Sequence, residues 1–128
     1  MFHYRWHFKE DADNAASLLP LNSNVNLAPE NWEVFKNYIG PRQIERLWVV
    51  GSNDTTAPTI EESYKRFLKI MEDHLQNLPF LLGERPSSSD FAIYGQLTQL
   101  IGFDPTSRKL AHEIKNPLTP IQLAAERL

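Results

Sequence analysis

The stretch TIEESYKRFLKIMEDHLQNLP, residues 59–79, decides the fold class of the chain. Its large apolar side chains recur every three or four positions, the spacing that places them on one face of an α-helix. Thr59 and Glu62 match the S/T-x-x-E capping box, with Thr56 as an alternative earlier start, and Pro79 ends the run. We therefore predict a long helix whose apolar stripe lies in the core: Tyr64, Phe67, Leu68, Met71, Leu75 and Leu78.

A second helix is predicted on the N-terminal side of this stretch. It begins at Pro29 and Glu30, because proline is tolerated in the first turn and an acidic side chain favours the positive end of the helix dipole. The pair Gly40-Pro41 predicts its end. Its predicted buried stripe comprises Trp32, Phe35 and Ile39, extended by Val34 and Tyr38.

The first thirty residues give weaker signals. The aromatic opening, Met1 to Lys9, alternates like a strand, yet Tyr4 and Phe8 are also four positions apart, so both strand and helix stay open. The stretch from Leu19 to Pro29 is predicted to be a loop, because it contains two prolines and three asparagines.

A second capped helix start follows the long helix, at Ser87 to Asp90. The Ser87 hydroxyl can accept a hydrogen bond from the Asp90 amide, while the Asp90 carboxylate reaches back to the Ser87 amide. The run from Phe91 to Ile101 continues as a helix, and the chain again has a helical pattern from Ser107 to Leu128. The chain is therefore predicted to be all-α, with five helices.

Composition excludes several classes of function. The 128 residues fit one domain, carry a net charge of −3 and contain no cysteine, which excludes thiol nucleophiles, disulfides and thiolate metal sites. The slight acidity argues against binding of a nucleic-acid backbone. No apolar run is long enough to span a membrane and no secretion signal opens the chain, so we expect a cytoplasmic protein without a membrane partner. We predict no metal site.

The segment from Phe80 to Ala92, FLLGERPSSSDFA, resembles the C-terminal helical domain of glutathione transferases. That family places a serine and an aspartate, as Ser87 and Asp90 here, before its central buried helix. The resemblance covers residues 1–106 and implies a helical bundle of the glutathione transferase C-terminal type. In that family a thioredoxin-like domain binds glutathione, but no βαβ pattern is present here. We therefore expect the glutathione site to be missing, and we expect neither a cofactor nor catalysis by this chain alone.

The part of the transferase site that this resemblance still implies is the apolar half-site, which binds the second substrate in that family. Four aromatic side chains are candidates for it: Tyr4, Trp6, Trp32 and Phe35. The alternative for each is a place in the core, because aromatic residues at helical spacing usually pack there. Loss of the thioredoxin-like domain would expose an apolar patch, which favours association.

The segment from Ala111 to Pro120, AHEIKNPLTP, resembles the H-box of sensor histidine kinases. The continuation, IQLAAERL, resembles the nitrogen-regulation branch of that family, and the resemblance covers residues 107–128. It implies that His112 accepts a phosphoryl group, that Asn116 positions a hydrolytic water, and that the helix belongs to a dimeric bundle. No asparagine- and glycine-rich boxes of an ATP site follow in this sequence, so we expect phosphorylation by a separate kinase domain.

The residues around His112 suit such chemistry. An apolar seam that includes Leu110 and Ile114 leaves His112 on the opposite face of the helix, toward solvent. A neutral imidazole can attack phosphorus, and Glu113 beside it can take the ring proton. The alternative is a surface histidine on a helix that completes the bundle.

Two functions are therefore predicted, from different classes. The first is a non-catalytic helical domain of transferase type that acts as an association module, with a second copy or a thioredoxin-like domain as its partner. The second is a phosphoacceptor element, phosphorylated at His112 by a kinase partner domain. The two resemblances meet near Ser107, as they would in a natural, engineered or misassembled fusion.

Overall fold

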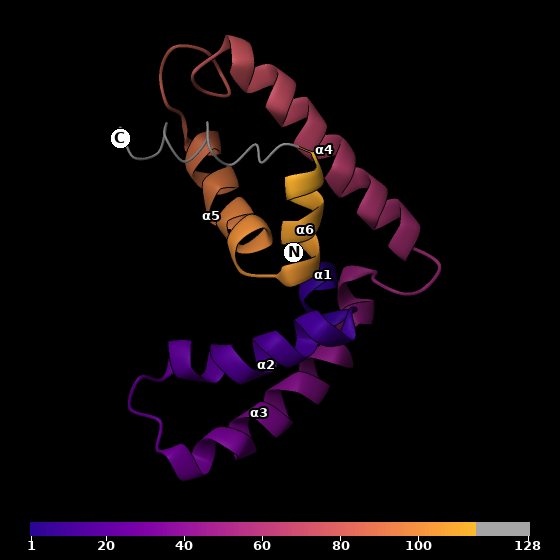
Figure 1. Cartoon of the computed structure of the whole chain (residues 1–128), viewed down its shortest axis with the longest axis vertical. Helices are drawn as coiled ribbons and strands as arrows, with labels where there is room; N and C mark the ends of the chain where they lie inside the picture. Colours follow the sequence, from indigo (N-terminus) through magenta and orange to yellow (C-terminus); the bar gives the residue numbers. More distant parts are fainter. Residues whose placement is uncertain (115–128) are drawn as a thin grey trace. The chain divides into compact units, whose positions relative to one another are not determined.

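The computed structural model describes residues 1–114, and the regular secondary structure of that part is helical throughout (Figure 1). The elements are α1 (Phe2–Trp6), α2 (Lys9–Ser23), α3 (Pro29–Ile44), the 3-10 helix η1 (Leu47–Val50), α4 (Ala57–Asn77), α5 (Ser88–Gly102) and α6 (Pro105–Glu113). The predicted all-α class is confirmed, although this part alone has six α-helices where five were expected in the whole chain. The chain divides into two compact units, Met1–Ile60 and Glu61–Leu128, and each is treated by itself below.

The aromatic opening of the first unit forms the helix α1. Tyr4 and Phe8, four positions apart, stack with their ring centroids 5.9 Å apart, so the helical spacing prevails over the alternation. His3 on this helix is buried, and its Nδ1 lies 2.7 Å from the Ser52 hydroxyl, 49 residues away in the sequence. This pairing connects α1 to the segment that follows η1.

Helices α2 and α3 pack against each other through small side chains. Ala12, Ala15 and Ala16 of α2 are buried, and so is Gly40 of α3. A Cβ atom built at Gly40 would lie 3.5 Å from the Ala16 Cβ, which is ordinary van der Waals contact. The two backbones therefore approach closely without a large side chain between them.

One predicted loop start and one predicted helix end in this unit are wrong, for a shared reason. Helix α2 continues to Ser23 with Pro20 inside it, so the loop predicted from Leu19 begins only at Asn24. Helix α3 continues past Gly40-Pro41 to Ile44. An internal proline costs a helix about 3 kcal/mol, and here the packing of α2 on α3 outweighs that local cost.

The predicted buried stripe of α3 is also wrong. Val34, Phe35 and Tyr38 are 65%, 46% and 61% exposed, while Trp32 and Ile39 are half-buried. The reason is that α3 approaches α2 most closely at its small residue Gly40, so the larger side chains of the predicted stripe are only partly covered by α2.

The long helix α4 begins at Ala57, earlier than Thr59, which confirms the alternative start at Thr56. The Thr56 carbonyl accepts the Ile60 amide at 3.0 Å, and the Asn53 side chain accepts the amides of Thr55 and Thr56 at 2.9 Å each. In the second unit, Tyr64, Leu68 and Met71 of the predicted stripe are buried. Leu75 and Leu78 are half-buried, and Phe67 lies at the exposed margin of that stripe.

Helix α5 begins with the capping box predicted from the sequence, formed between Ser87 and Asp90. Helix α6 packs against α5 and begins at Pro105 rather than Ser107. It ends at Glu113, with Ile114 already outside helical geometry at φ −101° and ψ 23°, so the helix predicted from Ser107 to Leu128 is interrupted there. Proline at 117 has no N–H for the Glu113 carbonyl, which accounts for the end at this position. Residues 115–128 lie outside the described part.

Candidate functional site

Helix α6 is fixed to the second unit along one face. Ser107 and Ala111, four positions apart, are completely buried. The Tyr64 hydroxyl of α4 donates a hydrogen bond of 3.1 Å to the Ser107 carbonyl, and the Ser107 hydroxyl donates to the Leu100 carbonyl of α5. The opposite face of α6 is consequently turned to solvent.

The solvent face of α6 carries four ionisable side chains. Arg108, Lys109, His112 and Glu113 are all exposed, and Arg108 and His112 are one helical turn apart. His112 therefore lies where the sequence placed it, on the side away from the packed face. Its side chain is exposed, as is that of the next residue, Glu113.

The third residue of the predicted phosphoacceptor site, Asn116, lies outside the described residues. Helix α6 ends at Glu113, before that position, so the predicted role of Asn116 stays a prediction. The candidate site in the described part of the chain is thus His112 with Glu113, Arg108 and Lys109.

The four aromatic residues predicted as an apolar half-site differ in their exposure. Tyr4 and Trp6 are only 2% exposed, as their alternative place in the core requires. The Trp32 ring is half-buried, and its Nε1 donates a hydrogen bond of 3.0 Å to the Ser17 carbonyl of α2. Phe35 lines an open groove.

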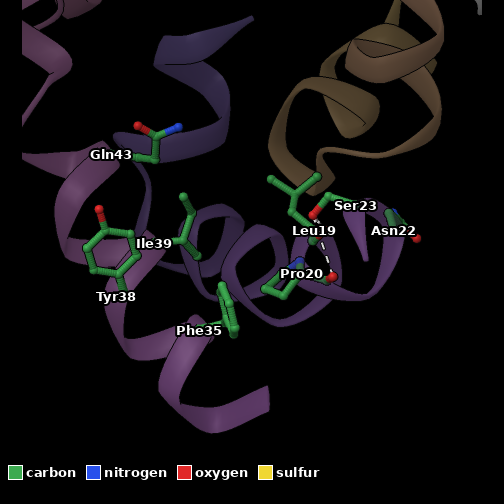
Figure 2. Close-up of a pocket in the computed structure, with 8 residues that line it drawn as sticks. All are labelled: Leu19, Pro20, Asn22, Ser23, Phe35, Tyr38, Ile39 and Gln43. Atoms are coloured by element: carbon green, nitrogen blue, oxygen red, sulfur yellow. Dashed lines mark hydrogen bonds between the residues drawn. The ribbon is translucent and has the colours of Figure 1, made fainter. Parts of the chain in front are cut away.

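That groove lies between α2 and α3 and encloses a volume of about 540 Å³ (Figure 2). Five of its lining residues are mainly apolar: Leu19, Pro20, Phe35, Tyr38 and Ile39. The other three are polar and uncharged: Asn22, Ser23 and Gln43. The Ser23 hydroxyl is engaged with the Leu19 carbonyl at 2.7 Å. The sequence did not reveal this groove, because its walls depend on how two helices pair.

The capping-box residues have a structural role. The Asp90 carboxylate accepts hydrogen bonds from the Leu81 amide at 3.0 Å, the Ser87 amide at 2.8 Å and the Ser87 hydroxyl at 2.8 Å. Partial burial opposes ionisation of Asp90, but these hydrogen bonds outweigh it and lower the pKa of its carboxyl group. Asp90 thereby fixes the loop before α5.

A buried histidine–serine pair lies in the first unit. The His3–Ser52 pair, which the sequence did not suggest, resembles a serine nucleophile with its base, but both residues are buried. No group of three or more metal-binding side chains gathers in this part of the chain. None of its helices combines the length and apolar character needed to cross a membrane.

Comparison with known proteins gives one short similarity. A stretch is 60% identical over 38 residues to the nitrogen regulation protein NtrY of Azorhizobium caulinodans, covering 25% of this chain and 5% of that protein. No protein-family model matches the chain, and no solved structure matches it. The glutathione transferase-type bundle for residues 1–106 therefore stays a prediction.

Proposed function

We propose that the segment beginning with α6 is a phosphoacceptor element of the sensor histidine kinase type, with His112 as the acceptor. The observation that carries this proposal is the exposure of His112 on a helix whose opposite face is anchored by Ser107 and Ala111. The name of the similar protein NtrY agrees with the nitrogen-regulation branch that the H-box resembles.

The proposed reaction needs little from this chain beyond position. A ring nitrogen of neutral His112 attacks the γ-phosphorus of ATP held by a separate kinase domain, and the bond to the bridging oxygen breaks as ADP leaves. The proton released from the imidazole passes to Glu113 or to water. Phosphoryl transfer depends mainly on positioning and charge neutralisation, so a fixed, accessible histidine is the part this chain supplies.

The test is phosphorylation in trans. The full chain is incubated with labelled ATP and a separately produced ATP-binding domain of a nitrogen-regulation sensor kinase. We expect acid-labile, alkali-stable label that is lost in His112→Gln and kept in the matched control His7→Gln. Label that persists in His112→Gln, or no label on the chain, would overturn the proposal.

We also propose a second function, self-association of the first unit through the exposed face of α3. The observation in its favour is the exposure of Val34, Phe35 and Tyr38 beside the α2–α3 groove, since exposed apolar patches commonly mark interaction surfaces. The expected partner is a second copy of the chain, as an association module of transferase type would require.

Light scattering across a concentration series tests this second function. The double variant Phe35→Ser, Tyr38→Ser should reduce the dimer fraction, whereas Phe91→Ser, an equally exposed aromatic position on α5, should leave it unchanged. A chain that stays monomeric at every concentration would contradict it.

A further inference from the structure

Two cations precede His112 on the exposed face of α6. Arg108 and Lys109 stand four and three positions before it. At roughly 100° per residue, they lie about 40° and about 60° from His112 around the helix axis, one turn below it. Side chains with these spacings are neighbours on the helix surface.

We infer that Arg108, assisted by Lys109, binds the phosphoryl group that His112 accepts, an inference that rests on the proposed function of His112. Among residues 1–114, neither side chain forms a hydrogen bond or an ion pair, so both donors are available to an anion. The acidic neighbour one turn before Arg108, Asp104, is completely buried.

The chemistry of the two cations fits this role. The guanidinium of Arg108 presents a planar fork of N–H donors that matches two phosphoryl oxygens, whereas the Lys109 ammonium acts as a point charge. Four positions after Lys109 stands Glu113, an acidic side chain that can compete with a phosphoryl group for the Lys109 ammonium. Four positions after Arg108 stands His112 itself, so no acidic side chain competes there. Arg108 is therefore expected to contribute more than Lys109.

Phosphoramidate is the probe, because it phosphorylates imidazole without a kinase or ATP. A ring nitrogen of His112 forms a bond to phosphorus, the P–N bond of phosphoramidate breaks, and ammonia leaves with the electron pair of that bond. The imidazole then carries the phosphoryl group, and its extra positive charge is lost as a proton to Glu113 or water. The 31P signal of phosphorylated His112 is identified as the one that His112→Gln lacks. Its growth with time gives the rate of phosphorylation of the full chain.

We expect Arg108→Ala to lower this rate roughly two- to fivefold at low salt, the effect typical of exposed charge pairs. Arg108→Lys should restore only part of the rate, because it keeps the charge but not the planar fork of donors. Arg42→Ala, which removes an exposed arginine from α3, is the charge-matched control and should leave the rate unchanged. The deficit of Arg108→Ala should shrink as salt is added, because solvent-exposed charges are screened.

Equal rates for the unmodified chain and Arg108→Ala at low salt would overturn the inference, and so would a deficit that salt leaves unchanged. The two proposals fail separately. If phosphoramidate labels His112 at a rate that depends on Arg108 while the kinase domain labels nothing, the phosphoacceptor function is wrong and the anion site stands. If both reagents label His112 at rates that do not depend on Arg108, the phosphoacceptor function stands and the anion site is wrong.

Discussion

The Tyr64 hydroxyl donates a hydrogen bond of 3.1 Å to the carbonyl of Ser107, and so links α4 to α6. Burial raises the pKa of the Tyr64 phenol, and the charge of Asp104 raises it further. The donor proton is therefore retained across the physiological pH range. This contact falls at the point where the two sequence resemblances meet, so the residues on either side of that point form one packed unit.

Tyr64→Phe should loosen α6 without unfolding the second unit. The substitution removes one buried hydrogen bond, for which we expect a loss of about 1 kcal/mol in the free energy of unfolding. Amide hydrogen exchange should quicken in α6 more than in α2. Urea titration and exchange mass spectrometry measure the two effects, and equal protection of α6 in both proteins would contradict the anchoring role of Tyr64.

Asp90→Asn should weaken the start of α5 and remove a pH dependence. Because the folded protein lowers the pKa of Asp90 below its unfolded value of 3.8, the stabilisation is present above that value and is lost as pH falls toward the folded pKa. At neutral pH the variant should lose about 1 kcal/mol through the damaged cap. Urea midpoints measured from neutral to acidic pH should converge for the two proteins; a constant difference would refute the linkage.

Alanine at two glycines should have opposite effects. Gly40→Ala places its Cβ in ordinary contact with Ala16 inside a helix, so a gain of up to about 1 kcal/mol is expected. Gly51→Ala strains a backbone at φ 71°, where a loss of roughly 1–2 kcal/mol is expected, although no atom obstructs the new methyl group. Thermal unfolding compares them, and a destabilised Gly40→Ala would mean that α2 and α3 pack more tightly than described.

Local signals explain which parts of the fold were predictable. The apolar spacing of α4 and the Ser87–Asp90 capping box act within a few residues of the chain, and both are present as predicted. The exposure of His112 followed from helix geometry alone. Arg108 and Lys109 were not among the predicted site residues, although the same geometry places them one turn before His112.

Tertiary contacts explain what the sequence could not reveal. Helix α3 continues through Pro41 because Gly40 packs closely on Ala16, although Gly40-Pro41 predicts a helix end. Phe35 stays exposed beside this contact, although the apolar spacing predicts that it is buried. The α2–α3 groove and the His3–Ser52 pair join positions far apart in the chain. No pattern within a short window encodes such pairings.

The most direct test of the central claim is to locate the phosphate after phosphorylation in trans. Fragment mass spectrometry at alkaline pH, which preserves phosphohistidine, should place a single phosphoryl group on His112 and none on His7 or His74. A phosphoryl group on any other side chain, or an unmodified His112 in the presence of an active kinase domain, would contradict the account.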